Sequence, residues 1–261
     1  MRQFTAEYLD ATREGMWADS REALAPLALP HRERVLDVGA GTGELTRVLR
    51  EESGGEVVAL DADPGLVGEV PPPAAVGDAT RLPFCDDAFD LVVCQALLVN
   101  LPDPAAAIRE FARVSRDAVA AIEPDNSAVS IQSTVDAESP LAARARRLYL
   151  DGVATDATLG GVGELFEDAG LTDVTVTRYD HVRSVEPPYS KRAVEAARRK
   201  ASGAGLAADR EQILAGEATR EEYDDLRQDW RAMGREVVDQ MQDREYRHRE
   251  TVPFFVTVGR V

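Results

Sequence analysis

The stretch Val35-Leu36-Asp37-Val38-Gly39-Ala40-Gly41-Thr42-Gly43 decides the fold that we expect for this chain. It begins with apolar residues typical of a buried strand and ends in three glycines at alternate positions. Helix-forming residues, 44–51, follow directly. The pattern predicts a parallel strand, a tight turn and a helix that begins against the strand. Glycines suit such a turn because they tolerate positive φ and leave no Cβ between the backbone and a ligand. The first N–H groups of the new helix add a local positive end.

The spacing of the glycines narrows the choice of ligand. A dinucleotide-binding fingerprint, G-x-G-x-x-G, needs a glycine at position 44, where this chain has Glu44. The turn also lacks the G-K-[ST] ending of a phosphate-binding P-loop. Asp37 before the turn and Glu44 after it are a poor setting for a pyrophosphate and favour a cationic or zwitterionic ligand. A glycine turn without a ligand is the alternative.

From this turn onward the chain resembles the class I S-adenosylmethionine (SAM)-dependent methyltransferases, and the end of the second predicted strand extends the resemblance. That strand, 56–60, ends at Asp61, which follows Gly43 at about the distance expected for a ribose-binding acid. The resemblance implies that Asp61 accepts hydrogen bonds from both ribose hydroxyls. Charge-assisted bonds of this kind contribute roughly 1.5–3 kcal/mol each. Asp63 with Pro64 indicates instead an N-cap followed by proline at the first helical position.

The third and fourth predicted strands end in further residues of the same pattern. Residues 75–84 resemble the third strand of the family and the turn after it. The resemblance implies that Asp78 accepts a hydrogen bond from the adenine amino group and that the Ala79 N–H reaches a ring nitrogen. A turn-forming role for Asp78 beside a glycine is the alternative. The fourth strand, 89–94, is apolar almost throughout, as expected for a strand covered on both faces, and ends at Gln95.

The resemblance covers about residues 31–180 and the last strand. It implies that the glycines leave space for the amino-acid tail and the adenosyl group of SAM, that Asp37 supports the turn and helps to fix the ammonium group, and that Gln95 lies near the methyl donor. SAM is therefore the expected cofactor. The residues expected to bind it are Asp37, Gly39, Ala40, Gly41, Gly43, Asp61, Ala62, Asp78, Ala79 and Gln95.

The stretch 98–104 departs from the family at one position. Asn100 stands where many small-molecule methyltransferases have histidine, and asparagine cannot act as a general base near neutral pH. A sulfonium methyl group is already electrophilic, so alignment with the acceptor and exclusion of water can supply the catalysis. The resemblance implies transfer of a methyl group to a small molecule, with the catalytic residue unknown. A non-catalytic SAM-binding regulatory or assembly protein is one alternative; a nicotinamide-dependent oxidoreductase is another, disfavoured by Glu44.

The fold class that these elements imply is α/β, with a Rossmann-like, doubly wound sheet of seven strands. The sheet is expected to be mostly parallel, with an antiparallel last strand over 252–258, an N-terminal helical segment and a helical insertion before the last strand. We expect one domain, residues 1–261. Its expected parts are an N-terminal helical segment (1–30), a SAM-binding half (31–124) and a substrate-side half (125–261) that includes the insertion (about 189–250).

Several segments outside the motifs leave two interpretations open. Helical spacing over 4–29 predicts a helix that packs on the sheet or one that also covers the cofactor, with Tyr8, Arg13 and Trp17 against SAM. In the insertion, apolar residues at helical spacing form a stripe along one side of a predicted helix. This stripe either packs on the domain or forms a lid or dimer surface. Its members are Tyr223, Leu226, Trp230 and Met233.

Polar residues near the fifth predicted strand, 118–123, also allow two interpretations. Glu123 and Asn126 at its end fit contact with the acceptor or a solvated strand end. Arg116-Asp117 stands where relatives have a glycine-bearing turn before this strand. A later helix, 141–153, carries three arginines that we expect to be salt-bridge partners on a solvated face: Arg144, Arg146 and Arg147.

The composition excludes some partners. The 261 residues carry a net charge of −17, a field that repels nucleic acid and anionic membranes. An acid-rich, lysine-poor chain resembles proteins of salt-loving archaea. Two cysteines and three separated histidines form no metal-binding pattern, and we expect the histidines to be structural or exposed. No apolar run approaches the roughly 20 residues of a membrane span, and the N-terminus lacks the apolar stretch of a signal peptide. We therefore expect a cytoplasmic protein.

Overall fold

The computed structural model of the protein describes residues 16–261, in two compact units. The sheet unit comprises residues 16–125, 155–181 and 253–261, and the helical unit comprises 126–154 and 182–252. The predictions for Tyr8 and Arg13 lie outside the described residues. The break after Asp125 falls one residue from the expected division between the two halves of the chain. That the whole chain is one domain stays a prediction.

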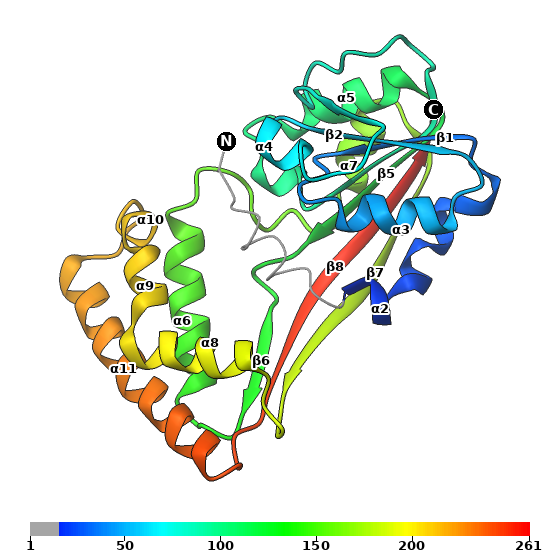
Figure 1. The fold of residues 1–261 in the computed structure, drawn as a ribbon. Coiled ribbons are helices and arrows are strands. Elements are labelled where there is room, and N and C mark those ends of the chain that lie inside the picture. Colours follow the sequence, from blue (N-terminus) through cyan, green and yellow to red (C-terminus); the bar gives the residue numbers. More distant parts are fainter. Residues whose placement is uncertain (1–15) are drawn as a thin grey trace. The chain divides into compact units, whose positions relative to one another are not determined.

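The described residues contain eight strands, in the order β3-β2-β1-β4-β5-β8-β6, with β7 paired to β8 (Figure 1). Strands β1 to β5 are parallel where they pair, and β8 runs antiparallel to β5 and β6. This arrangement confirms the α/β fold class and the antiparallel last strand, and β6 is a strand that the sequence did not predict. The bounds are β1 Arg34–Val38, β2 Glu56–Asp61, β3 Ala74–Val76, β4 Phe89–Gln95, β5 Ser115–Pro124, β6 Ser130–Ser133, β7 Thr172–Val185 and β8 His248–Arg260.

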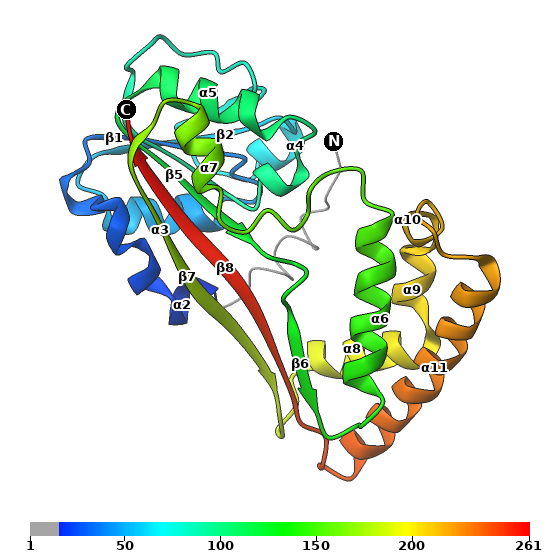
Figure 2. The same cartoon turned by 180° about the vertical axis from the view of Figure 1, so that it is seen from behind.

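Helices cover both faces of the sheet unit, with α3 on one face and α5 and α7 on the other (Figures 1 and 2). Alternate residues of β1 point to opposite faces: Val35 packs with Leu45 of α3, whereas Leu36 packs with Phe111 of α5 and Phe166 of α7. All seven residues of β4 are buried, which explains why the strand is apolar at most positions. The α-helices of this unit are α2 Met16–Asp19, α3 Glu44–Glu52, α4 Pro64–Val67, α5 Pro104–Val114 and α7 Gly163–Asp168.

The N-terminal segment is less helical than the sequence predicted. After α2, the chain forms two 3-10 helices, η1 (Arg21–Leu27) and η2 (Leu29–His31), rather than a continuous α-helix to residue 29. Pro26 lies inside η1, and Ala28 between the two has a left-handed φ of 53°. A proline cannot donate the hydrogen bond that an α-helix needs, so the segment tightens into short 3-10 turns.

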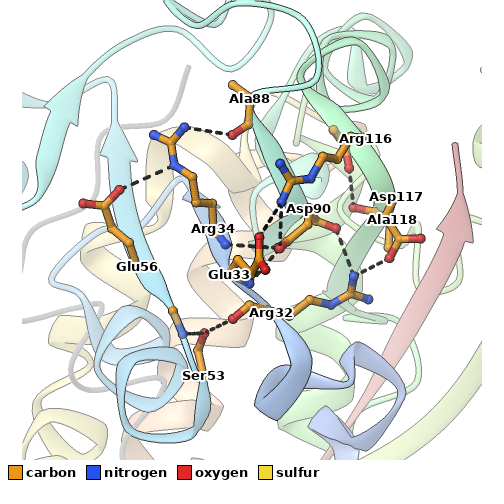
Figure 3. A network of polar contacts seen from close by, with 12 residues as sticks. Arg32, Glu33, Arg34, Ser53, Glu56, Ala88, Asp90, Arg116, Asp117 and Ala118 are labelled. Atoms are coloured by element: carbon orange, nitrogen blue, oxygen red, sulfur yellow. Dashed lines mark hydrogen bonds and ion pairs between the residues drawn. The ribbon is translucent and has the colours of Figure 1, made fainter.

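A network of ion pairs joins the amino ends of β1, β4 and β5 (Figure 3). The buried Arg32 donates to the Asp90 carbonyl at 3.0 Å and pairs with Asp117. The Asp90 carboxylate accepts the backbone N–H of Glu33 at 2.7 Å. Burial raises the pKa of Asp117, but the bond from Arg32 and the charge of Arg260 outweigh it and lower that pKa below its usual value.

This network corrects the interpretation of Arg116-Asp117 as a turn before the fifth strand. Strand β5 already begins at Ser115, and both residues lie within it. The carboxylate of Asp117 pairs with arginines from two other segments, and this fixes the strand start without a glycine turn.

In the helical unit, the long helix α11 packs against α6 and α8, and it begins at a capping box formed by Thr219 and Glu222. Tyr223, Leu226 and Met233 of the apolar stripe are buried among the helices of this unit itself, and the role of the insertion as a lid or dimer surface stays a prediction. Its helices are α6 Glu138–Asp151, α8 Lys191–Ser202, α9 Ala204–Ala208, α10 Arg210–Ile213 and α11 Arg220–Gln242.

For Arg146 the predicted ion pair is confirmed, but the predicted solvated position is wrong. Its side chain is only 20% exposed, and it donates to the Val129 carbonyl at 2.9 Å and lies 3.7 Å from Glu250. A guanidinium on an amphipathic helix can reach backbone carbonyls of a neighbouring segment, which sequence spacing does not reveal.

Glu138, at the start of α6, is the centre of a buried polar cluster. It is 1% exposed, pairs with Lys200 and accepts hydrogen bonds from the hydroxyls of Ser133 (2.6 Å) and Tyr246 (2.9 Å). His248 Nδ1 lies 3.3 Å from the same carboxylate. Burial raises the pKa of Glu138, but the contacts with His248 and Lys200 outweigh it and hold that pKa well below its usual range. The cluster gives His248 a structural role.

Candidate functional site

The predicted glycine turn follows β1 and opens α3. Gly39, Gly41 and Gly43 have φ values of 74°, 57° and 83°, a region that side-chain-bearing residues rarely adopt. The backbone N–H groups of Gly39 and Ala40 both donate to the carbonyl of Leu60, at 2.7 and 3.0 Å. The turn is therefore folded against the end of β2. These contacts confirm the strand, turn and helix that the sequence predicted.

Asp61, at the end of β2, binds this turn directly. Its Oδ2 accepts the N–H of Gly41 at 2.9 Å, and its Oδ1 accepts the N–H of Asp63 at 2.9 Å. Each carboxylate oxygen has a second lone pair, so the two oxygens can still accept from a pair of neighbouring hydroxyls. The structure thus adds a turn-anchoring role that the sequence did not predict. Asp63 accepts the Gly65 N–H at 2.7 Å and Pro64 is the first residue of α4, which confirms the predicted cap.

Asp37 and Asp78 occupy different environments at the ends of their strands. Asp37 is 1% exposed and accepts the hydroxyl of Thr46, on α3, at 2.6 Å, in keeping with the predicted support of the turn. Asp78 is exposed, and its Oδ1 accepts both the N–H and the hydroxyl of Thr80 at 2.8 Å. One oxygen of Asp78 therefore has the turn-forming role that was the alternative to adenine binding. Its contact with adenine stays a prediction, as does that of the buried Ala79.

Gln95, at the end of β4, is 4% exposed and binds the N-terminal segment. Its Oε1 accepts the indole N–H of Trp17 at 3.3 Å, and its Nε2 lies 3.1 Å from the sulfur of Met16. Trp17 is buried and meets the ring of Phe254 edge-on, with ring centroids 6.4 Å apart. The packing interpretation of Trp17 is therefore confirmed, and the position of Gln95 near a methyl donor stays a prediction.

Glu123 contradicts the interpretation of a solvated strand end. It is fully buried at the end of β5, and its Oε1 accepts the backbone N–H groups of Leu97 at 3.0 Å and Leu98 at 2.9 Å. Its Oε2 accepts the N–H of Val99 at 3.3 Å. The segment after β4 folds over the carboxylate and keeps it from any acceptor at the surface. Burial raises the pKa of Glu123 to about 7, although the three backbone N–H groups oppose the shift.

Asn100 belongs to the same segment, which forms the 3-10 helix η3 (Leu98–Asn100). Its side-chain amide donates to the Ala96 carbonyl at 2.8 Å, and this bond joins the two ends of the segment 96–100. Cys94 is buried and Cys85 is exposed, and the two do not form a disulfide.

All ten residues of the predicted site lie at, or just after, the carboxyl ends of four neighbouring strands. These strands are β1, β2, β3 and β4, which lie side by side in the order β3-β2-β1-β4. The crevice at such strand ends is where open α/β sheets bind ligands. The site combines carboxylates, which accept hydrogen bonds, with glycine backbone, and this combination fits a ligand with a ribose and a positive charge. Within residues 16–261, no group of three or more His, Cys, Asp or Glu side chains is arranged to hold a metal ion.

Comparison with known proteins agrees with this geometry. A family model described as a methyltransferase domain matches residues 36–122, which is less than half of the chain. The demethylmenaquinone methyltransferase of Mycobacterium sp. (strain KMS) is 41% identical over 99 residues. That alignment covers 37% of this chain and 43% of the relative, so the chain spans less than half the length of the curated relatives it matches.

Solved structures with low sequence identity share the fold. The YcgJ protein of Bacillus subtilis is 16% identical, with a TM-score of 0.52 over 92% of this chain and 98% of that chain. Phosphoethanolamine N-methyltransferase 2 of Haemonchus contortus, solved with S-adenosylhomocysteine, is 17% identical. Its TM-score is 0.51, over 99% of this chain and 58% of that chain. With the family model, these findings confirm the resemblance of the cofactor segment to class I SAM-dependent methyltransferases, whose cofactor is SAM.

Proposed function

We propose that this protein transfers the methyl group of SAM to a small-molecule acceptor. One observation carries the proposal: the Asp61 carboxylate at the end of β2 binds Gly41 in a turn with three positive-φ glycines at the end of β1. This arrangement matches the ribose and amino-acid ends of SAM, and it stands within the segment that matches a methyltransferase domain.

Different residues of the site bind different parts of SAM. Asp61 accepts hydrogen bonds from the ribose hydroxyls and from the Gly41 N–H. The carboxylate of Asp78 accepts a hydrogen bond from the adenine amino group. The glycines leave the backbone open to the amino-acid tail, and the buried Asp37 stabilises the turn from the side of α3. When bound, SAM supplies a methyl group on a sulfonium. The protein's contribution is then to align that group with the acceptor and to exclude water.

A small neutral or cationic acceptor suits the protein better than a polyanion. The net charge of −17 opposes binding of nucleic acid. None of the helices in the described part of the chain combines the length and apolar character that a membrane crossing requires. The curated relative is named for demethylmenaquinone, which makes that compound the first acceptor to assay.

The proposal is tested by incubating the purified protein with SAM labelled on the methyl group and with fractions of cell metabolites. We expect label to pass to at least one small-molecule fraction, and Asp61→Ala to abolish most of the transfer. Binding of SAM without transfer to any fraction would favour a regulatory SAM-binding protein instead. Absence of SAM binding would contradict both.

A further inference from the structure

A chain of contacts links the buried Glu123 to the glycine turn. The carboxylate of Glu123 binds the N–H groups of Leu97, Leu98 and Val99. The side chain of Leu97 in turn lies against Gly39: a Cβ built on Gly39 would be 2.9 Å from the Cδ1 of Leu97. The backbone that Glu123 holds therefore carries the side chain that packs on the first glycine of the turn.

The segment that Glu123 holds is strained at its start. Ala96 has a φ of 49°, a left-handed conformation that is unfavourable for a residue with a Cβ. Such a conformation persists only where surrounding contacts over-determine it. The contacts here are the three bonds to Glu123, the Asn100 amide on the Ala96 carbonyl (2.8 Å), and the Ala96 N–H on the carbonyl of Ile122 (2.9 Å).

The cost of burying Glu123 indicates that the carboxylate does more than fill space. A carboxyl group with no exposure is expensive to bury unless its lone pairs are satisfied. Here its oxygens face the Cys94 thiol at 3.6 Å and three backbone N–H groups of one segment. An apolar side chain of the same size would fill the interior but would leave those N–H groups without an acceptor.

We propose that Glu123 is a positioning residue of the SAM site, which holds residues 97–99 so that Leu97 packs on Gly39 and shapes the wall of the cofactor crevice. The inference rests on the proposed function, because SAM is the ligand whose affinity reports the effect. Glu123 acts through Leu97 and does not touch the cofactor.

The test is calorimetric measurement of SAM affinity in a double-mutant cycle. Glu123→Gln keeps one acceptor oxygen but turns a donor group toward the remaining N–H, and we expect it to weaken SAM binding about tenfold. Leu97→Ala removes the side chain that packs on Gly39, and we expect a similar loss. In the Leu97→Ala background, Glu123→Gln should then cost little further affinity, because both changes break the same contact chain.

A control separates positioning from general loss of stability. Val119→Ala truncates a fully buried side chain of the same strand, four positions before Glu123, that makes no hydrogen bond to the 97–99 backbone. We expect it to lower the melting temperature while SAM affinity stays that of the wild type. Hydrogen exchange should show faster exchange of the 97–99 amides in Glu123→Gln and not in Val119→Ala.

Two results would overturn the inference. One is unchanged SAM affinity in Glu123→Gln or in Leu97→Ala. If Glu123→Gln does not fold, the SAM affinity of Leu97→Ala alone tests the inference. The other is full additivity in the double mutant, which would show that Glu123 acts by a route other than Leu97. Failure of the wild type to bind SAM would instead refute the proposed function, so the two failures are distinguishable.

Discussion

The Oδ2 of Asp61 accepts a hydrogen bond of 2.9 Å from the backbone N–H of Gly41, and this bond joins the end of β2 to the glycine turn after β1. The carboxylate that we assign to the ribose is thus also part of the turn's own architecture. A ligand that binds both elements meets a preformed surface, because the turn is already fixed to its neighbouring strand.

Replacement of Asp61 is expected to have two effects. Asp61→Ala should weaken SAM binding roughly 10- to 100-fold, because charge-assisted hydrogen bonds to the ribose are lost. It should also lower the melting temperature slightly, since Gly41 and Asp63 lose their acceptor. Calorimetry measures the first effect and thermal unfolding the second.

Asp63→Ala is the matched control for Asp61→Ala. It removes the cap on Gly65 and should cost about 0.5–2 kcal/mol of stability while SAM affinity is unchanged. Equal loss of SAM affinity in both variants would show that a general disturbance of residues 61–65, and not a ribose contact, underlies the effect.

Asp78→Ala should weaken SAM binding less than Asp61→Ala. An adenine amino group is a neutral donor that makes one bond, whereas the ribose offers two hydroxyls. Thr80→Val is the control, because it removes one hydroxyl bond to Asp78 and leaves the carboxylate in place. A loss in Asp78→Ala that equals or exceeds that in Asp61→Ala would reverse the ranking of the two contacts.

Gly234 is expected to be essential for packing in the helical unit. A Cβ at this position would overlap the backbone of Lys200 and Ala201, where α11 crosses α8. Gly234→Ala should therefore destabilise the protein by about 1–3 kcal/mol through overpacking. Gly205→Ala, in α9, is the control, because a Cβ there meets nothing within 4 Å. Similar melting temperatures for the two variants would contradict the predicted close approach of α8 and α11.

The raised pKa of Glu123 predicts a pH dependence of stability. Burial raises its folded-state pKa from 4.5 to about 7, so the folded protein binds more protons than the unfolded chain between these values. The contribution of Glu123 is therefore greatest below pH 4.5 and falls as the pH rises to about 7, by an amount on the order of 3 kcal/mol.

This contribution is measured as the difference in unfolding free energy between the wild type and Glu123→Gln, whose amide does not titrate. We expect the difference to shift against the wild type from pH 5 to pH 7, in denaturant titrations at constant salt. A difference that is flat, or that shifts toward the wild type, would show that the carboxyl group is ionised throughout this range.

The residues that the sequence placed correctly are those whose roles follow from local pattern. The glycine turn and the strand end at Asp61 each depend on a few neighbouring residues, and the fold class follows from their order along the chain. The cap at Asp63 is equally local. Strand β4 was recognisable because a strand covered on both faces is apolar along most of its length.

The roles that the sequence missed depend on residues far away in the chain. Glu123 is buried because the segment after β4 folds over it, across 24 to 26 positions of sequence. Arg146 is held by Val129 and Glu250, and Asp117 by Arg32 and Arg260. An acid directly after the apolar run 118–122 was the available signal for Glu123.

A crystal structure of the protein with S-adenosylhomocysteine tests the central claim most directly. We expect the nucleoside at the carboxyl ends of β1 and β2, with both ribose hydroxyls within hydrogen-bonding distance of Asp61 and the amino-acid tail against the glycine turn. An empty crevice in crystals soaked at saturating ligand, or a ribose turned away from Asp61, would contradict it.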